Sequence, residues 1–304
     1  MAPVNNASAS ITCPQCAGAI RLRFTATDVN RGISSEKFKY FLCKDCDLIF
    51  LDPLPPDLGR YYPSDYYVFP KNLDIVAELA RHERYKLDFV TRYLSCGKLI
   101  EIGPATGGFC HLAKEAGFQV RAIEMDARCS KFLRDVIGIE VQNSNEEVTA
   151  LDREALADVI ALWHVIEHLR DPWAMIDAIA AKVNPGGIAI IATPNPHAFQ
   201  FKIWGKRWTH VDAPRHVVLI PPELLVRRMQ ARGMELLELT TSDPGGIGWN
   251  WFGWVFSVAN LTTVPWLKRL FKIIGRIARA LVQIIEDQEG RGAAYTAVFR
   301  KKIS

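Results

Sequence analysis

The sequence predicts an α/β protein whose main domain is a doubly wound, mostly parallel sheet with helices on both faces. Three observations support this fold class. Apolar strand patterns alternate with helical patterns over most of the chain, and a glycine-rich turn joins the first of these strands to its helix. Two Cys-x-x-C pairs near the N-terminus add a small metal-binding module. Alternation favours a parallel sheet, because parallel neighbours are joined by crossover helices.

The composition is that of a folded protein with one large core and a small accessory module. The chain has 304 residues, of which 49% are hydrophobic and 23% are charged, and its net charge is only +4. So mild a charge gives little support to nucleic-acid binding. Residues 1–10 lack the basic start and apolar core of a signal peptide, so we expect a flexible leader and a cytoplasmic protein.

The first module, residues 11–52, carries four of the seven cysteines in two pairs. Cys13 and Cys16 are separated by 26 residues from Cys43 and Cys46. Each pair can form a tight turn whose two thiolates bind one ion, so the spacing predicts a zinc ribbon. We expect a structural Zn²⁺, because so small a module has too little apolar core to fold alone. Redox chemistry at one pair is the alternative, although neither pair opens a helix of a βαβ unit.

A proline- and tyrosine-rich linker is expected at residues 53–73. Its prolines favour extended backbone, and its tyrosines are expected to pack on the main domain or to line the substrate entrance. The main domain follows over residues 74–304 and begins with a helix at 74–94, where apolar residues recur at helical spacing.

Residues 99–126 contain the turn that organises the main domain. A buried strand leads into the turn, a helix follows, and a second strand ends at Glu124. The glycines of the turn, which let a ligand approach the backbone, are Gly103, Gly107 and Gly108. Glu101 just before them would repel a diphosphate but suits a cationic ligand. Glu124 lies about 20 residues beyond the turn and is placed to accept hydrogen bonds from ribose hydroxyls.

The turn Glu101-Ile-Gly-Pro-Ala-Thr-Gly107 resembles motif I of the class I S-adenosylmethionine-dependent methyltransferases, with Ala105 in place of the second glycine. Two later blocks, residues 158–172 and 183–195, are similar to further motifs of this family, and the first of them resembles ubiquinone-type O-methyltransferases and their small-molecule relatives. A ribbon followed by a tyrosine-rich linker also resembles a bacterial group that includes sugar C-methyltransferases. The resemblance implies a seven-stranded Rossmann-like sheet, closed by an antiparallel last strand.

The resemblance also implies which residues bind S-adenosylmethionine. The turn would surround the methionine moiety, Glu124 would hold the ribose, Met125 would pack on the adenine and Asn145 would meet its amino group. The residues expected to contact the cofactor are Glu101, Gly103, Ala105, Thr106, Gly107, Phe109, Glu124, Met125, Asn145 and Trp163.

Histidines are the candidates for the general base. Methyl transfer needs an aligned nucleophile and removal of its proton, and histidine titrates near neutral pH. His216, His210 and His164 are the candidates. His216 is the first choice because its loop follows the fifth strand, over the expected substrate site, and the ribbon-bearing sugar methyltransferases have a histidine in a similar place. A structural hydrogen bond is the alternative role for each.

A second metal site is an alternative use of His164, Glu167 and His168, which share one face at i, i+3 and i+4. Some ubiquinone O-methyltransferases and plant small-RNA methyltransferases carry Glu-x-x-Glu-His there, completed by a later histidine. Here His164 replaces the first glutamate, which argues against Mg²⁺ and leaves a softer ion, with His216 as a fourth ligand, as the open variant. Otherwise Glu167 and His168 are expected to be structural.

A helical insertion is predicted at residues 244–290, before the last strand. Its first part, up to Leu267, has no charged residue but has four tryptophans. Its second part has an apolar helical stripe and a basic polar side, a pattern typical of helices in a membrane interface. Because glycines, asparagines and a proline interrupt the uncharged run, we expect interfacial or re-entrant contact through residues 245–289 rather than a spanning helix. Covering the active site or forming a dimer interface are the alternatives.

We therefore expect a methyltransferase that acts on a small-molecule, sugar or lipid-linked acceptor, peripheral to the inner face of the cytoplasmic membrane. An RNA methyltransferase that uses the ribbon for binding is the alternative, but the ribbon has a modest basic set and no obvious aromatic stacking platform. A non-catalytic scaffold is a third hypothesis, against which the complete turn and Glu124 argue. Oxygen, carbon and nitrogen acceptors stay open, as does the oligomeric state.

Overall fold

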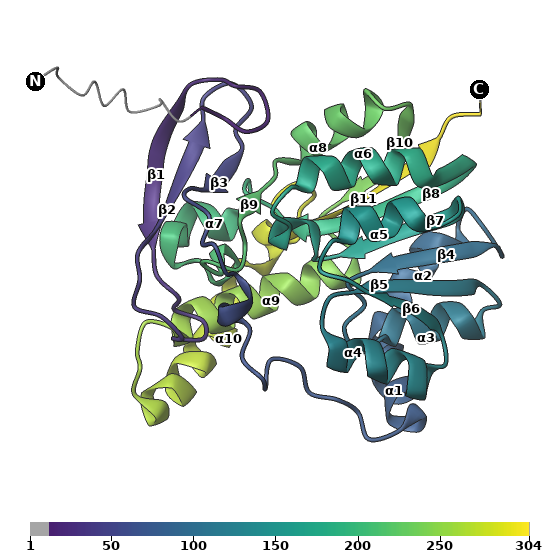
Figure 1. The fold of residues 1–304 in the computed structure, drawn as a ribbon. Helices are drawn as coiled ribbons and strands as arrows, with labels where there is room; N and C mark the ends of the chain where they lie inside the picture. Colours follow the sequence, from purple (N-terminus) through teal and green to yellow (C-terminus); the bar gives the residue numbers. More distant parts are fainter. Residues whose placement is uncertain (1–11, 304) are drawn as a thin grey trace, which may run out of the picture.

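The computed structural model describes residues 12–303, so the expected leader at 1–10 lies outside the described residues. Figure 1 shows a large sheet flanked by helices and a small sheet beside it. The strands of the large sheet are β4 (Lys98–Ile102), β5 (Gln119–Glu124), β6 (Glu140–Asn143), β7 (Ala157–Trp163), β8 (Val183–Pro194), β10 (Met234–Thr240) and β11 (Ala294–Lys301). Their order is β10-β11-β8-β7-β4-β5-β6, and β11 runs antiparallel to both of its neighbours. This confirms the predicted seven-stranded sheet.

Helices cover both faces of the large sheet, as predicted. The α-helices are α1 (Leu73–Ala80), α2 (Arg84–Thr91), α3 (Gly108–Glu115), α4 (Ala127–Phe132), α5 (Glu147–Arg153), α6 (Pro172–Lys182), α7 (Phe199–Trp204), α8 (Pro222–Gln230), α9 (Pro244–Ala259) and α10 (Pro265–Glu286). The short helical turns are η1 (Gly59–Tyr61), η2 (Arg81–Glu83), η3 (Leu133–Ile137), η4 (Ile166–His168), η5 (Gly205–Arg207) and η6 (Thr209–Val211).

Residues of the central strands point alternately into two apolar cores. Ile100 and Ile160 belong to the core under α5, α6 and α8, whereas Leu99 and Val159 belong to the core under α1, α2 and α3. This alternation follows from the two-residue period of a strand that is buried on both faces.

The helix expected at residues 74–94 is divided into α1 and α2 by the turn η2. The helix starts where the Asn72 side chain accepts a hydrogen bond from the Ile75 amide at 3.0 Å. Both halves pack on α3, which has only 8 residues. A straight helix over residues 74–94 would be about 30 Å long and would run past so short a partner.

The small sheet consists of β1 (Ile20–Ala26), β2 (Phe38–Cys43), β3 (Ile49–Leu51) and β9 (Val218–Leu219), in that order. The first three strands belong to the cysteine module, but β9 comes from the loop that follows β8 in the main domain. Ile49 pairs with Leu219 and Phe50 with Val218. The module and the main domain therefore share a sheet, and their buried residues form one continuous core.

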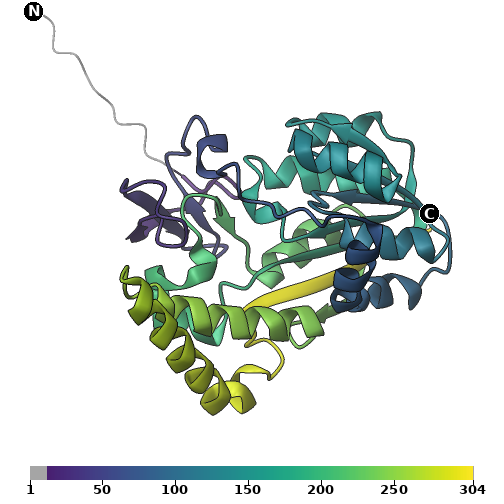
Figure 2. The ribbon, with the colours of Figure 1, turned by 90° about the horizontal axis from the view of Figure 1, so that it is seen from below.

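The insertion before β11 consists of α9 and α10, which pack against each other along one side of the molecule (Figure 2). The Asp243 side chain caps α9 by accepting from the amides of Gly245 and Gly246 at 2.8 and 3.1 Å. Gly275 of α10 allows the close approach, because a Cβ there would lie 2.7 Å from the Cα of Val255. Among residues 12–303, none of the helices has the length and apolar character needed to cross a membrane.

The uncharged run of the insertion is divided between buried and exposed residues. Trp254 is buried and donates to Glu286 at 2.9 Å, while the Trp249 ring lies 4.5 Å from His164 and 5.3 Å from His210. Packing on the protein therefore accounts for the apolar residues on the inner face of α9, whereas Ile247 and Trp251 of the same helix are exposed. The second helix of the insertion, α10, is more exposed. Its Trp266 and much of its apolar stripe face away from the protein.

Candidate active site

The expected cofactor residues gather at the carboxyl ends of three adjacent strands. Glu101 lies near the end of β4, Glu124 ends β5 and Trp163 ends β7, and β4 is hydrogen-bonded to both of the other strands. Because these strands are parallel, their carboxyl ends meet at one edge of the sheet, where ligands bind in open α/β folds.

The turn after β4 depends on glycine for both conformation and space. Gly103 has φ +67°, and a Cβ there would lie 2.6 Å from Val165 Cγ2. Gly107 has φ +75°, and a Cβ would lie 2.5 Å from Leu133 Cδ2. Ala105 also adopts a left-handed conformation, with φ +51°. A non-glycine residue there is strained by roughly 1–2 kcal/mol.

Glu124 is buried beside this turn. Its Oε2 accepts from the Ala105 amide at 3.0 Å and its Oε1 from the Asp126 amide at 2.8 Å. Burial raises the pKa of Glu124 to about 7, although the same amides act in the opposite direction. Each oxygen accepts one hydrogen bond here and retains a lone pair for a second donor, such as a hydroxyl.

Glu101 forms the second buried carboxyl group of the site. Its Oε2 accepts from the Cys110 thiol at 2.9 Å. Burial raises the pKa of Glu101 to about 7, and the ammonium group of Lys86 opposes this rise. Two buried carboxyl groups lie beside the glycine turn, and the Lys86 ammonium is a positive charge that acts on one of them. The ammonium and sulfonium charges of S-adenosylmethionine and the hydroxyls of its ribose fit this donor set.

Five of the expected cofactor residues differ in their exposure. The Phe109 and Trp163 rings pack edge to face at 5.6 Å in the apolar core. Met125 and Asn145 are exposed, and Thr106 is half-buried at the surface of the turn. Asn143, rather than Asn145, donates to the carbonyls of Glu124 and Met125, at 2.8 and 3.0 Å.

Two residues near the carboxylates were not predicted from the sequence as part of the site. Lys86 of α2 acts on Glu101 as described above, and its ammonium lies 5.4 Å from the Trp163 ring centre. Tyr67 of the linker is mostly buried, and burial together with the charge of Glu124 raises its pKa. The tyrosine-rich composition of the linker was the only signal for Tyr67, and the helical pattern around Lys86 gave none.

The candidate bases lie next to this edge. The His168 and His216 rings are perpendicular, with their centres 4.5 Å apart. His216 Nδ1 lies 2.8 Å from the carbonyl of His210, so in the neutral ring Nδ1 carries the proton and Nε2 has the free lone pair. His168 Nδ1 lies 3.1 Å from the carbonyl of Arg215 and 3.0 Å from the hydroxyl of Tyr62. Burial lowers the pKa of His168 to about 4.

Glu167 provides a fully buried negative charge beside the two rings. Its Oε2 accepts from the Thr193 hydroxyl at 3.0 Å, and its Oε1 lies 3.5 Å from His164 Nδ1 but has no hydrogen-bond partner. Although burial alone would raise it, the pKa of Glu167 is lowered to about 2 by His164 and by the charge of His216. The site therefore places a buried carboxylate beside imidazole rings.

The same side chains could also hold a metal ion. Donor atoms of Glu167, His168 and His216 lie within 4.8 Å of one another. One carboxylate and two imidazoles suit a softer ion such as Zn²⁺ better than Mg²⁺. His164 is not part of this group, and its ring instead lies against Trp249.

The contacts of His210 favour a structural role. Its Nε2 lies 3.1 Å from the carbonyl of Trp249, and its ring packs between Trp208 and Trp249. Burial lowers the pKa of His210 to about 3, so the ring is neutral near physiological pH.

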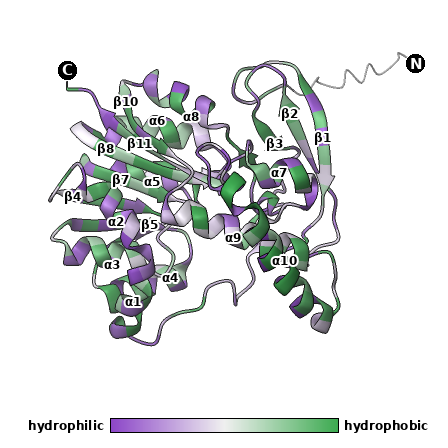
Figure 3. Ribbon diagram, turned by 180° about the vertical axis from the view of Figure 1, so that it is seen from behind, coloured by the Kyte–Doolittle hydropathy of each residue, from purple (hydrophilic) through white to green (hydrophobic). Residues whose placement is uncertain are grey.

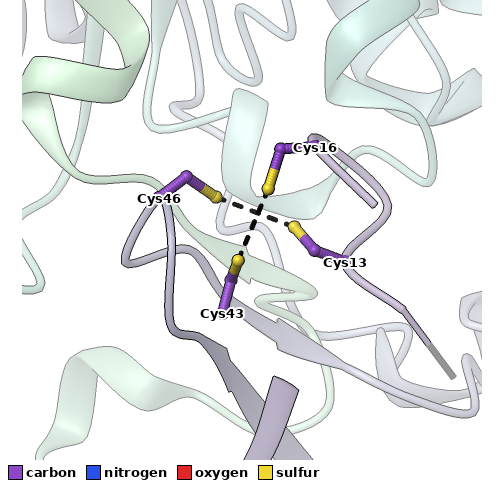
Figure 4. A group of neighbouring side chains, drawn as sticks. All are labelled: Cys13, Cys16, Cys43 and Cys46. Carbon is purple, nitrogen blue, oxygen red and sulfur yellow. Dashed lines mark hydrogen bonds between the residues drawn. The ribbon is translucent and has the colours of Figure 1, made fainter. Parts of the chain in front are cut away.

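The four cysteines of the N-terminal module converge on one point (Figure 4). The Cys13 and Cys46 sulfurs are 3.7 Å apart, and the Cys16 and Cys43 sulfurs are 3.5 Å apart. These separations are close to the edge of a tetrahedron around Zn²⁺, about 3.8 Å for Zn–S bonds of about 2.3 Å. The amides of Gln15 and Asp45 point at the sulfurs of Cys13 and Cys43, each at 3.4 Å. Four thiolates with amide donors fit Zn²⁺.

Comparison with known proteins places this geometry in context. A family model described as "Methyltransferase domain" matches residues 66–239. The chain is 22% identical over 241 residues to "Ubiquinone biosynthesis O-methyltransferase" of Cupriavidus pinatubonensis, and the match covers 70% of this chain and 94% of that protein. The protein of the same name from Bordetella avium is 24% identical over 181 residues, which cover 56% of this chain and 73% of the relative.

Solved structures that resemble this one include a SAM-dependent methyltransferase from Archaeoglobus fulgidus. That structure has a TM-score of 0.48 and 18% identity, and the match covers 73% of this chain and 94% of that one.

Proposed function

Because the chain belongs to the class I S-adenosylmethionine-dependent methyltransferases, we propose that it methylates a small-molecule, sugar or lipid-linked acceptor at a membrane surface. The observation that carries this proposal is the pair of buried carboxyl groups, Glu101 and Glu124, at the ends of adjacent strands. When bound, S-adenosylmethionine supplies a methyl group that its sulfonium charge has already activated. The turn residues and Glu124 hold the cofactor, and Glu101 balances its positive charge.

His216 is the residue that we propose as general base. The carbonyl of His210 fixes the proton of the neutral ring on Nδ1, so Nε2 is free to remove a proton from the acceptor. The Glu167 carboxylate then stabilises the imidazolium that forms, because the two side chains lie in one buried cluster. Proton removal suits a hydroxyl or an acidic carbon as the methyl acceptor.

The surface of α10 supports an acceptor that is reached at a membrane. Figure 3 shows hydrophobic residues along this helix. Leu281 and Ile284 are 78% and 80% exposed, and Trp266 is 67% exposed. Basic residues flank this stripe and can meet anionic headgroups: Lys268, Arg269, Lys272 and Arg276. The names of the relatives, which place them in ubiquinone biosynthesis, are consistent with a lipid-like acceptor. We propose peripheral binding to the inner face of the cytoplasmic membrane.

A methyl-transfer assay with radiolabelled S-adenosylmethionine tests this function. The purified protein is incubated with separate lipid, polysaccharide, RNA and small-metabolite fractions of its own cells, and the His216→Ala variant is the control for the base. We expect label in the lipid, polysaccharide or small-metabolite fraction, and much less label with the variant. Label in RNA would overturn the proposed acceptor class. Full activity of the variant would remove His216 as the base.

A further inference from the structure

The cysteine module contacts the loop that carries His216 through buried polar side chains. Arg215 is fully buried, and its Nη2 donates to Asp28 at 2.6 Å and to Asp212 at 2.7 Å. Its Nη1 also donates to the carbonyl of Tyr61 in the linker at 3.2 Å. Asp28 belongs to the loop between β1 and β2, so the residue just before His216 is held from outside its own domain.

His216 and its other neighbour are held from the same side. Tyr40 of β2 is fully buried, and its hydroxyl donates to the carbonyl of His216 at 2.8 Å. The Leu51 amide donates to the carbonyl of Val217 at 2.8 Å, and the Val217 amide donates to the carbonyl of Glu167 at 2.7 Å. Residues 215–217 are therefore fixed between the cysteine module and the main chain of Glu167.

Asn30 fixes the start of the same loop. Its side-chain amide donates to the carbonyl of Thr209 at 2.7 Å and to Asp212 at 2.5 Å. Its carbonyl oxygen accepts from Asn260, the residue after α9, at 2.8 Å. The loop between β1 and β2 thus contacts both ends of the segment that contains His210 and His216.

These contacts fix the orientation of two imidazole rings as well as the fold of the loop. The carbonyl of His210 faces Nδ1 of His216, and the carbonyl of Arg215 faces Nδ1 of His168. A movement of residues 210–216 would therefore turn both rings. A buried ion pair adds little net stability compared with apolar packing, so its main effect is to fix one arrangement.

We propose that Asp28 and Tyr40 of the cysteine module are positioning residues for His216, the base under the proposed function. On this view the module holds the loop of His216 in place. This explains why β9, a strand of that loop, completes the small sheet of the module. Tyr40 acts on the main chain of His216 itself, and Asp28 acts through Arg215.

Replacement of the Tyr40 hydroxyl tests the proposal in the full-length protein. Tyr40→Phe removes one hydrogen bond and leaves the ring in place. The matched control is Tyr295→Phe, because the buried Tyr295 hydroxyl donates to the carbonyl of Ile220 at 3.1 Å and does not contact His216. Asp28→Asn is the second variant, and thermal melting of each variant reports whether it is folded.

Three readouts separate positioning from a structural role. In ¹⁵N spectra of histidine-labelled protein, we expect the Nδ1–H signature of His216 to be replaced by a mixture of tautomers in Tyr40→Phe but not in Tyr295→Phe. Methyl transfer to the cell fraction that accepts label should fall roughly tenfold to a hundredfold in Tyr40→Phe. The Kd for S-adenosylmethionine should stay unchanged in both variants.

An unchanged His216 spectrum in folded Tyr40→Phe and Asp28→Asn would overturn the proposal, as would equal loss of activity in Tyr40→Phe and Tyr295→Phe. The spectrum does not depend on an acceptor, so it still tests the positioning if no fraction accepts label. A changed spectrum together with a fully active His216→Ala variant would refute the proposed base alone.

Discussion

Glu124 accepts main-chain hydrogen bonds with both oxygens, and these bonds fix the orientation of its carboxyl group at the end of β5. We expect Glu124→Gln to weaken binding of S-adenosylmethionine roughly tenfold to a hundredfold, because a hydrogen bond to a charged group contributes about 1.5–3 kcal/mol. Titration calorimetry measures this change. Glu140→Gln, at an exposed glutamate of the adjacent strand β6, is the control. Equal affinities for Glu124→Gln and the unaltered protein would refute the assignment.

The raised pKa values of Glu101 and Glu124, each about 7, predict that cofactor binding depends on pH. Below pH 7 both groups are mostly protonated and neutral, whereas a bound cation favours their ionised forms. Binding near pH 7 therefore releases protons, and affinity should rise between pH 6 and pH 8 by up to about tenfold in total for each group.

Calorimetry in two buffers of different ionisation enthalpy detects this proton release as a difference in heat. We expect the difference to be present at pH 7 and to shrink by pH 9, where both groups are ionised before binding. Identical heats in the two buffers at pH 7 would show that neither carboxyl group changes its protonation.

At the level of single residues, the sequence predicts those parts of the site that follow a spacing rule. Glu101 and Glu124 lie at fixed offsets from a glycine turn, and the turn fixes where each side chain emerges. Lys86 and Tyr67 follow no such rule, because α2 and the linker reach the site only through tertiary packing. Asn143, the last residue of β6, bonds the main chain beside Glu124, and the contact expected between Asn145 and the adenine stays a prediction.

Among the elements, α10 presents an apolar face that the rest of the described chain leaves exposed. We expect the Leu281→Glu/Ile284→Glu variant to lose binding to liposomes rich in phosphatidylglycerol, because two charges would enter the most exposed part of the stripe. Its melting temperature should be unchanged, since neither side chain is buried. Co-sedimentation measures the binding.

Val68→Glu and Ile303→Glu are the controls for this variant, because both replace well-exposed apolar residues outside α10. These controls should sediment with liposomes like the unaltered protein. Failure of the unaltered protein to sediment at any lipid composition would refute membrane binding by α10.

Sequence alone could not separate the environments of α9 and α10. An uncharged run satisfies a protein interior and a lipid phase equally well, so the tryptophans of residues 244–267 suggested an interface. In the structure Trp254 donates to a buried glutamate and Trp249 lies against two histidines, whereas the other two tryptophans of this run are exposed. The stripe of α10 was predicted better, because its period is a property of the helix itself.

For the molecule as a whole, the predicted seven-stranded sheet follows from strand patterns that are long and apolar. The union of the cysteine module with the main domain could not be predicted in this way, because β9 has only 2 residues and no periodic pattern. The sequence therefore suggested a module that ends at residue 52, whereas β3 pairs with β9 and Asp28 forms a buried contact with Arg215, both in the loop that carries His216.

Because of this union, we expect a metal ion held by the four cysteines to stabilise the entire chain. We expect Cys43→Ser to lower the melting temperature of the protein by several degrees, because a loss of even 1 kcal/mol shifts the melting temperature of a domain of about 200 residues by roughly 2–4 °C. A single calorimetric transition should shift as a unit, since the module and the main domain share a core. Cys96→Ser, at an exposed cysteine outside the cluster, should melt like the unaltered protein.

Elemental analysis should find about one zinc per chain, lost in Cys43→Ser. A main transition that stays in place while the zinc is lost would mean that the cysteine module folds independently of the enzyme body.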